Sequence, residues 1–353
     1  LNSITILYKA IFRSKSFILQ LLKPFQKIMT FLEDVRLQLE KLPYPVADCT
    51  GKTIVVVGSN IGMGKEAVRH FARLNASKII VAVRSISKGE EAKADIEATT
   101  KRTGVLEVWE LDLARYASVQ AFAARLSTLP RVDAVVANAS IAKHKFELFE
   151  GSESQITVNV ISTFLLILLV LPILRKSAAA WNIAPVITVV SSDIHSWTQF
   201  PEWKAPNTLD KLNDEKTSKM PDRYPVSKLL QIFASREIAA KLANEKPKVV
   251  LNIISPGLTK TALTRDATGM TKIAMFAMKA LMGRTSEEGG RTLVHAATAG
   301  PESHGLYFVN CDLKKGPLSP FVKSAEGNEA QKKLWGEILA KLESIQPGIS
   351  ANL

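Results

Sequence analysis

The chain has 353 residues, a formal net charge of +13 and two cysteines. Two cysteines cannot build a disulfide framework and show no metal-ligand spacing, so the composition favours a reducing compartment and no metal site. The lysines and arginines are dispersed and form no recognisable nucleic-acid-binding motif, so nucleic acid is not an expected partner.

The first 28 residues differ from the rest, because they contain five lysines and arginines, many apolar residues and no acidic residue. Charges interrupt every apolar run well before the roughly 20 residues that a membrane-spanning helix needs. The segment is compatible with a basic amphipathic helix on a membrane surface or with a transit sequence. We favour a third interpretation, in which residues 1–28 are not native, because the sequence begins without methionine and Met29 follows. A cytoplasmic location agrees with it, whereas an interfacial segment implies a peripheral location on an intracellular membrane.

The first predicted strand is Thr53–Val57, a β-branched run typical of a buried parallel strand. It leads into a glycine-rich sequence and then into a helical pattern over residues 65–74. The apolar face of that helix contains Ala67, Val68, Phe71 and Ala72. A strand, a glycine loop and a helix N-terminus together form the arrangement that binds the pyrophosphate of a dinucleotide.

Each glycine of the loop has an expected task in the spacing G-x-x-x-G-x-G. Gly58 permits a tight turn, Gly62 lets a cofactor approach the backbone, and Gly64 allows the helix to pack closely on the strand. The predicted cofactor contacts of this loop are Gly58, Ser59, Asn60, Ile61, Gly62 and Gly64.

The second predicted strand, Lys78–Val83, ends at Arg84, about twenty residues beyond the glycine loop. An NAD-selective site usually has an acidic residue near this point to bind the ribose 2′-hydroxyl. No Asp or Glu occurs between residues 78 and 89, whereas Arg84 and Lys88 are present. A guanidinium suits a 2′-phosphate, so the sequence favours NADP(H) over NAD(H), with Arg84 and Lys88 as cofactor residues. The alternative is that Arg84 is a solvent-facing arginine at a strand end.

Alternating strand and helix patterns continue to Val309 and predict a single Rossmann-type α/β domain, a doubly wound parallel sheet of about seven strands with helices on both faces. Further strands are expected at Val105–Glu110, Ala134–Ala137, Val186–Ser191, Val249–Ser255 and Gly305–Val309. We assign the catalytic domain to residues 51–312, between an N-terminal extension, residues 1–50, and a C-terminal tail with a helix, residues 313–353. The apolar run Phe164–Leu171 is too short to span a bilayer and predicts a buried helix or a dimer face, which leaves a homo-oligomer open.

Tyr224 and Lys228 lie four residues apart, which places a phenol and an ammonium on the same helix face. A cation beside a phenol lowers the phenol pKa from its reference value of about 10. Tyr224 could then exchange a proton with a carbonyl or alcohol oxygen near neutral pH. Pro225 restrains Tyr224 away from helical geometry and Asp222 could cap the helix, so we expect the helix to start close to Tyr224.

Residues 193–222 form an insertion rich in Pro, Trp and Lys, just before the Tyr-Lys pair. The insertion either is an exposed loop or covers part of a substrate pocket. In the second case its apolar surface would come from Trp197, Phe200 and Trp203. His195 could touch a substrate, but a histidine in such a segment is more often a loop residue.

Together with further motifs in the expected order, these features resemble the short-chain dehydrogenase/reductase family over residues 51–308. The further motifs are Asp112-Leu113, Ala137-Asn138-Ala139-Ser140, Asn159 in Thr157–Val160, Ser192 in Val189–Ser192, and Pro256–Thr261. Among the members of the family, the chain is most similar to fungal retinol-dehydrogenase-like enzymes of secondary-metabolite pathways. Residues 109–113 and the tail from residue 332 to 348 contribute to this similarity.

The resemblance implies roles that spacing alone does not assign. It implies that adenine contacts Asp112 and Leu113, and that the cofactor also contacts Asn138, Ala139, Tyr224, Lys228, Pro256, Gly257, Thr259 and Thr261. It implies a catalytic tetrad of Asn159, Ser192, Tyr224 and Lys228. In that tetrad, Ser192 donates a hydrogen bond to the carbonyl oxygen and Tyr224 delivers the proton. Lys228 also binds the nicotinamide ribose, and Asn159 holds a water that links the lysine to solvent.

The chain departs from the family pattern at two positions near the cofactor. Val57 replaces a threonine whose hydroxyl tethers the glycine loop, and Ser140 replaces a glycine. If the turn at Ser140 needs a positive φ, serine costs roughly 1 kcal/mol there.

Chemistry and resemblance together predict an NADP(H)-dependent oxidoreductase. It would transfer a hydride between the nicotinamide and a ketone or alcohol of a hydrophobic small molecule. The competing interpretation is a redox sensor or scaffold that binds the dinucleotide without turnover, but such proteins usually lose the tyrosine or the lysine. A sugar-nucleotide epimerase would need a G-x-x-G-x-x-G loop, which this sequence does not have.

Overall fold

The structure is a computed structural model that describes residues 35–246, 248–261, 263 and 269–353. The prediction about residues 1–28 therefore lies outside the described residues. Leu42–Leu353 form one compact unit, and every element named below belongs to it.

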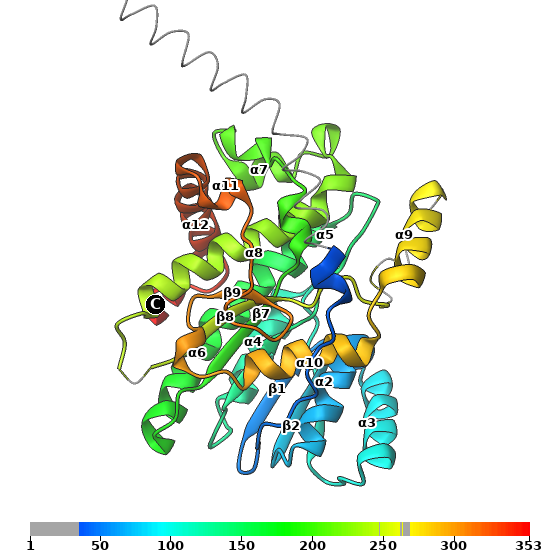
Figure 1. The fold of residues 1–353 in the computed structure, drawn as a ribbon. Helices are drawn as coiled ribbons and strands as arrows, with labels where there is room; N and C mark the ends of the chain where they lie inside the picture. Colours follow the sequence, from blue (N-terminus) through cyan, green and yellow to red (C-terminus); the bar gives the residue numbers. More distant parts are fainter. Residues whose placement is uncertain (1–34, 247, 262, 264–268) are drawn as a thin grey trace, which may run out of the picture. The chain divides into compact units, whose positions relative to one another are not determined.

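A seven-stranded parallel sheet forms the centre of this unit, in the order β3-β2-β1-β4-β7-β8-β9 (Figure 1). The strands are β1 (Thr53–Val57), β2 (Lys78–Val83), β3 (Leu106–Glu110), β4 (Ala134–Ala137), β7 (Val186–Val190), β8 (Val250–Ser255) and β9 (Tyr307–Val309). All seven predicted strands are confirmed, with ends that shift by two residues at most. The predicted fold class is confirmed as well. A short antiparallel hairpin of β5 (Leu148–Phe149) and β6 (Ser152–Glu153) was not predicted.

Helices cover both faces of the sheet, and the strands other than β3 are almost wholly buried. On one face, α2 (Gly62–Arg73), α3 (Ile86–Thr100) and α10 (Ser286–Ala297) share a hydrophobic core with β1 and β2. The four apolar residues predicted for the inner face of α2 are all buried there. The other face carries α4 (Tyr116–Leu126), α6 (Ser162–Trp181) and α8 (Met220–Leu242).

The run Phe164–Leu171 lies in α6 and is almost wholly buried within the domain, which confirms the buried-helix interpretation. A short α5 (Ser154–Ile156) and a wider turn at Thr157–Ile161 precede α6. In the described part of the chain, this stretch, Ser154–Trp181, is the one helix long and apolar enough to cross a membrane, but 83% of its most apolar window is buried. Burial of this kind is what a core helix shows.

The C-terminal residues pack on the helix that carries Tyr224 and Lys228. Helix α12 (Ala325–Ile345) lies against α8, and α11 (Pro320–Lys323) precedes it (Figure 1). The Gln331 amide donates to the Glu237 carboxylate, and the Arg236 guanidinium donates to the Val322 carbonyl. These contacts tie α8 to both helices of the tail.

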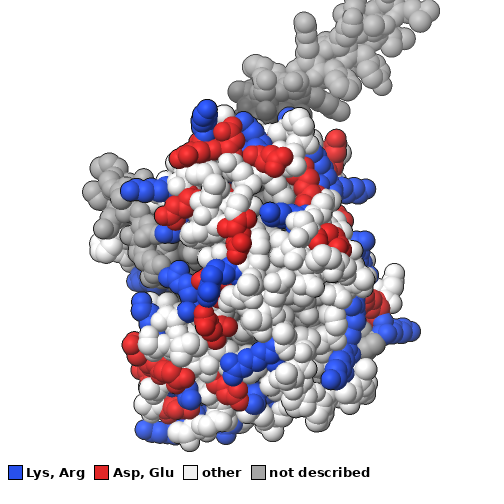
Figure 2. Space-filling view, turned by 180° about the vertical axis from the view of Figure 1, so that it is seen from behind, with Lys and Arg blue, Asp and Glu red and all other residues white. Residues whose placement is uncertain are grey.

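Positive and negative side chains are mixed on the face that Figure 2 shows, rather than gathered into a basic stripe. Several of the lysines and arginines have acidic partners, such as Arg175 with Glu245 at 2.5 Å and Arg69 with Asp95 at 2.5 Å. On this face, the positive net charge therefore forms no continuous track for a polyanion.

Candidate active site

The glycine loop between β1 and α2 is packed as its spacing predicts. Gly58 has a φ of +72°, and a Cβ on it would lie 2.8 Å from the Cβ of Ala139. A Cβ on Gly64 would lie 2.5 Å from the Gly58 carbonyl oxygen. Any side chain at either position would clash, so the predicted tight turn and close packing are confirmed. Gly62, with a φ of +64°, has Thr261 as its nearest neighbour on the Cβ side, 3.7 Å away.

Asn138 supplies the tether that Val57 cannot provide. Its side-chain amide donates to the carbonyl oxygens of Val57 at 3.0 Å and Gly58 at 3.1 Å. The Ser59 hydroxyl donates to the Val56 carbonyl at 2.7 Å, and Ser59 is fully buried. The side chain of Ser59 therefore points into the domain, so any cofactor contact from Ser59 must come from its backbone.

Arg84 and Lys88 lie at the carboxyl end of β2 and at the start of α3, and both are exposed. Neither side chain has a hydrogen bond or ion pair to any residue that the structure describes. Both cations are therefore available to an anionic ligand at this edge of the sheet.

Asp112 and Leu113 follow β3. The Asp112 carboxylate accepts from the Ala114 N–H at 3.0 Å and pairs with Arg115 at 3.2 Å. Both contacts stabilise the turn that contains Asp112. Leu113 is buried. The predicted adenine contact of this pair stays a prediction.

The four predicted catalytic residues come from three neighbouring elements. Asn159 lies in the wider turn before α6, Ser192 follows β7, and Tyr224 and Lys228 lie one turn apart on α8. Ser192 is half-buried, and its Oγ accepts from the Ile194 N–H at 3.3 Å. The hydroxyl of the preceding serine, Ser191, donates to the Lys228 carbonyl at 3.0 Å, which joins the end of β7 to α8.

The Lys228 ammonium is buried and hydrogen-bonded within the protein. Its Nζ donates to Ser140 Oγ at 2.8 Å, to the Val190 carbonyl at 2.8 Å and to Gln231 Oε1 at 3.0 Å. Gln231 is a site residue that the sequence analysis does not predict. Its one sequence signal is its position three residues after Lys228 on the same helix.

The side chain and the backbone carbonyl of Asn159 are both hydrogen-bonded within the protein. Its side chain accepts from the Ile141 N–H at 2.9 Å and donates to the Ile141 carbonyl at 2.9 Å and to Ser227 Oγ at 3.0 Å. The Asn159 carbonyl accepts from the Gln231 amide at 2.7 Å. The Gln231 side chain thus links Asn159 to Lys228, and the water expected at Asn159 stays a prediction.

The pKa of Tyr224 is shifted in the direction opposite to the one expected. Burial raises the pKa of Tyr224 above its usual value, although part of the residue stays exposed. Burial also lowers the pKa of Lys228 to about 7. The lysine Nζ lies 5.5 Å from the centre of the tyrosine ring and directs its protons at other acceptors, so desolvation outweighs its attraction for a phenolate.

Helix α8 begins at Met220, four residues before the predicted start. Pro221 occupies the first turn, where a missing N–H costs nothing, and Pro225 lies within the helix. Asp222 does not cap the helix, because its carboxylate accepts from the Thr198 hydroxyl at 2.7 Å. The fully buried pair of Arg223 and Glu153, 3.5 Å apart, joins the first turn of α8 to the start of α5.

The insertion contributes less apolar surface than its composition suggests. Phe200 and Trp203 are buried, so both belong to the core rather than to a pocket wall. Trp197 is 68% exposed and remains available to a ligand. His195 is also buried, with both ring nitrogens bonded to backbone groups, which rules out the substrate contact considered for it.

The segment after β8 faces the glycine loop. Gly257 has a φ of +71°, and Thr259 pairs with Arg284 in an isolated bridge. Lys279, in α9 (Gly269–Met282), donates to the Thr261 carbonyl at 3.0 Å. Residues 262 and 264–268, which follow this segment, lie outside the described residues.

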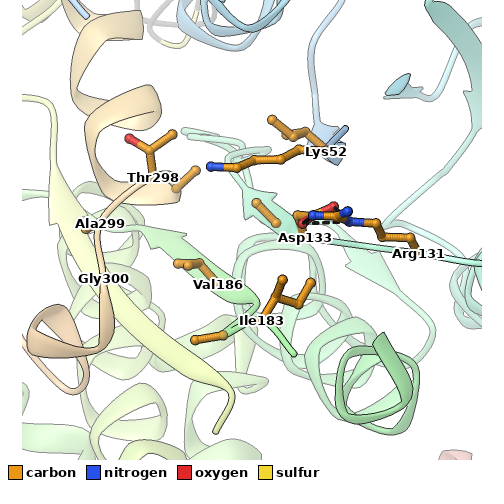
Figure 3. Close-up of a pocket in the computed structure, with 12 residues that line it drawn as sticks. Lys52, Arg131, Asp133, Ile183, Val186, Thr298, Ala299 and Gly300 are labelled. Atoms are coloured by element: carbon orange, nitrogen blue, oxygen red, sulfur yellow. Dashed lines mark hydrogen bonds and ion pairs between the residues drawn. The ribbon is translucent and has the colours of Figure 1, made fainter. Parts of the chain in front are cut away.

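A cavity of about 260 Å³ lies at the other end of the sheet, beside the first residues of β1, β4 and β7 (Figure 3). Arg131 and Asp133 form an ion pair of 2.7 Å in its wall, and Asp133 also accepts from the Thr53 N–H. None of the site residues predicted from the sequence lines this cavity. Ligands of open α/β sheets bind at the carboxyl ends of the strands, where the glycine loop and Lys228 lie.

Comparison with known proteins identifies the family. The sequence matches the short chain dehydrogenase family over residues 52–196. It is 47% identical to the short chain dehydrogenase/reductase dmxR8 of Cryptosporiopsis sp., over 89% of this chain and 97% of that protein. It is 44% identical to the short-chain dehydrogenase anuD of Penicillium roqueforti, over 87% of this chain and 81% of that protein. The chain therefore belongs to the short-chain dehydrogenase/reductase family and is an oxidoreductase with relatives in fungi.

Solved structures share the fold at lower identity. The oxidoreductase yciK of Escherichia coli is 22% identical, with a TM-score of 0.56 over 76% of this chain and 98% of that chain. A short chain dehydrogenase of Escherichia coli CFT073 complexed with NADPH is 22% identical, with a TM-score of 0.55 over 75% of this chain and 99% of that chain.

The residues present fit the nicotinamide dinucleotide that the family uses. The glycine loop leaves its backbone uncovered at Gly62, where a Cβ would meet nothing closer than 3.7 Å. Two exposed cations follow β2, and a buried lysine lies beside the turn that contacts Gly58. A backbone cradle, cations and a lysine are the groups that pyrophosphate, phosphate and ribose require.

Proposed function

We propose that this protein is an NADP(H)-dependent oxidoreductase that reduces a hydrophobic ketone, or oxidises the corresponding alcohol. Its proposed catalytic residues are Asn159, Ser192, Tyr224 and Lys228. The observation that carries the proposal is a pair of contacts made by two consecutive residues. Ala139 lies against the glycine loop at Gly58, and the next residue, Ser140, accepts a hydrogen bond from Lys228. The glycine loop and the tyrosine–lysine helix thereby meet at one place.

The preference for NADP(H) rests on the end of β2. Arg84 and Lys88 are exposed and have no partner among the described residues, and no acidic residue occurs between positions 78 and 89. A 2′-phosphate would neutralise two cations there, whereas a 2′-hydroxyl would find no carboxylate to accept its proton.

The proposed mechanism assigns one task to each side chain. The carbonyl carbon would receive a hydride, which a bound nicotinamide cofactor would supply. Ser192 donates a hydrogen bond to the carbonyl oxygen, where negative charge grows, and the Tyr224 phenol gives its proton to that oxygen. The ordinary pKa of a tyrosine, about 10, already keeps the phenol protonated at neutral pH. Burial raises the pKa of Tyr224 further, so the phenol holds the proton that reduction requires.

A hydrophobic substrate is supported by apolar side chains on the segments next to the site. Trp197, five residues after Ser192, is exposed, and so are Phe276 and Leu281 of α9. Helix α9 is bonded to the segment after β8 through Lys279. The resemblance to fungal enzymes of secondary-metabolite pathways agrees with an apolar ketone or alcohol as substrate.

The proposal is tested by binding and turnover. NADPH and NADH are titrated into the protein while nicotinamide fluorescence is followed, and NADPH is expected to bind more tightly. A panel of hydrophobic ketones and aldehydes is then screened by loss of absorbance at the nicotinamide band. Turnover of at least one ketone is expected. Tight NADPH binding without turnover across the panel would favour the sensor or scaffold, and failure to bind either dinucleotide would refute both.

A further inference from the structure

All three protons of the Lys228 ammonium are used inside the cofactor-free protein. A lysine ammonium has three donors and no acceptor. The three acceptors are Ser140 Oγ, the Val190 carbonyl and Gln231 Oε1, at 2.8, 2.8 and 3.0 Å. Lys228 is 1% exposed, so no proton points into bulk water. A ribose hydroxyl can therefore accept from Lys228 only if one of these three contacts lengthens or breaks.

The contact to Gln231 is costly to break. Gln231 is fully buried, and its amide bridges two buried groups: its oxygen accepts from Lys228, and its nitrogen donates to the Asn159 carbonyl at 2.7 Å. A carbonyl acceptor on one side and an ammonium donor on the other fix the orientation of this amide. Rotation of Gln231 would leave polar atoms unpaired in the interior, which is strongly unfavourable. The Val190 carbonyl is backbone at the buried end of β7 and cannot turn away.

The contact to Ser140 is the one that can yield. Ser140 is only half-buried, so its hydroxyl can rotate and exchange Lys228 for water. Its φ is not positive, so the backbone strain considered for a serine at this position does not arise. The serine therefore occupies the turn at no conformational cost, and its hydroxyl is the most exchangeable of the three acceptors.

We propose that the Ser140 hydroxyl competes with the cofactor for Lys228, so that the ribose of a bound dinucleotide must displace it. This inference rests on the proposed function, in which Lys228 binds the nicotinamide ribose. Ser140 stabilises the cofactor-free protein and contributes nothing to the Lys228 bond of the complex. The residue thereby sets the affinity for the cofactor without touching the reacting atoms, and it is a positioning residue.

The consequence is that removal of a polar group from the site strengthens cofactor binding. Ser140→Ala removes an acceptor from the free protein only, so NADPH should bind about threefold to tenfold more tightly, the ratio that one ordinary hydrogen bond supplies. Ser140→Gly should behave in the same way, and Ser140→Thr, which keeps the hydroxyl, should bind as the wild type does. Ser127→Ala serves as the matched control, because that hydroxyl donates to the Ala124 carbonyl at the end of α4.

The experiment combines two measurements that need no substrate. NADPH affinity is measured by fluorescence titration at about pH 6, below the pKa of about 7 that burial gives Lys228. Thermal unfolding is measured without NADPH and at saturating NADPH. The cofactor-free Ser140→Ala protein should unfold at a lower temperature than the wild type, and the two saturated proteins should unfold at nearly the same temperature.

Two results would overturn the inference. Unchanged or weaker NADPH binding by Ser140→Ala and Ser140→Gly would show that the hydroxyl stays on Lys228 or itself holds the cofactor. An equal loss of unfolding temperature with and without NADPH would lead to the same conclusion. If the wild type and every variant fail to bind NADPH, the proposed function fails and takes this inference with it, whereas normal wild-type binding with unresponsive variants rejects only the role of Ser140.

Discussion

The ring Nε2 of His195 accepts a hydrogen bond from the backbone N–H of Ser319 at 3.1 Å. Because that partner is a donor, Nε2 must be unprotonated, so Nδ1 carries the proton and donates to the Ser192 carbonyl at 2.9 Å. One neutral imidazole therefore joins the backbone of the candidate catalytic serine to the segment that precedes α11.

This arrangement predicts acid sensitivity. Burial lowers the pKa of His195 below its usual value of 6.5, so between the two values the unfolded chain binds more protons than the folded one. The stability that the neutral histidine provides is present above about pH 6.5 and is lost as the pH falls below it. We expect the unfolding temperature to drop between about pH 7.5 and pH 5.5, measured by circular dichroism. His195→Gln, whose amide oxygen can accept from Ser319 without titrating, should show a smaller drop, and an equal drop would contradict the assignment.

Tyr224→Phe should reduce turnover by at least about 10²-fold and leave NADPH affinity within about twofold of the wild-type value. Only the phenolic proton is lost, and positioned proton transfer typically contributes 10²–10⁴-fold. The measurements are steady-state rates with a ketone found in the screen and a fluorescence titration with NADPH. Tyr44→Phe, a change to an exposed tyrosine that lies on Arg73, is the control and should change neither quantity. Near-normal turnover by Tyr224→Phe would remove this residue from the mechanism.

Arg84→Asp should weaken NADPH by about 2–3 kcal/mol, because a charge-assisted bond is lost and a repulsion is added. NADH should bind as well as before or better. The comparison uses Lys101→Asp, which makes the same change in charge at the exposed C-terminal end of α3, whereas Lys88 lies at the start of that helix. The ratio of NADPH to NADH affinity is the measurement, and a ratio that does not move would show that the 2′-phosphate lies elsewhere.

Gln231→Leu should destabilise the cofactor-free protein by roughly 2–6 kcal/mol, since Lys228 and the Asn159 carbonyl each lose a buried partner worth about 1–3 kcal/mol. Denaturant unfolding measures this loss. Gln120→Leu removes a partly exposed glutamine that bonds the end of α12, and it should cost less than about 1 kcal/mol. Similar losses in the two variants would mean that the bridge between Lys228 and Asn159 has little weight.

The sheet was predictable because its strands are short, β-branched and buried on both sides, so the sequence pattern and the environment agree. Gly58 and Gly64 were predictable for a related reason, since only glycine leaves room for Ala139 and for the Gly58 carbonyl at these positions. The glycine spacing and the tyrosine–lysine spacing are local, and a local signal survives in a single sequence.

What could not be predicted depends on contacts between distant segments. Gln231 bonds Asn159, 72 residues earlier, and Ser140 bonds Lys228, 88 residues later, so neither role is visible in the local sequence. The pKa of Tyr224 follows from desolvation, which the four-residue spacing does not reveal. The burial of Phe200 and Trp203 is not predictable from the sequence, because loop composition does not tell whether an aromatic ring faces solvent or core.

The predicted start of α8 is wrong because both local signals, Pro225 and Asp222, are overridden by contacts with distant residues. Pro225 disfavours a helical conformation at Tyr224. Tyr224 is nevertheless helical, and the buried ion pair of Arg223 and Glu153 stabilises the first turn of α8. The preference that a proline imposes on its predecessor is a bias, and packing of this kind overrides it.

The packing of α12 on α8 has a practical consequence for anyone producing this enzyme. The stretch that matches the family, residues 52–196, contains the glycine loop and Ser192 but neither Tyr224 nor the helices that support it. An expression clone trimmed to that match would lose Tyr224 and Lys228, half of the proposed catalytic residues. A clone that ends before α12 would lose the helix that packs on α8.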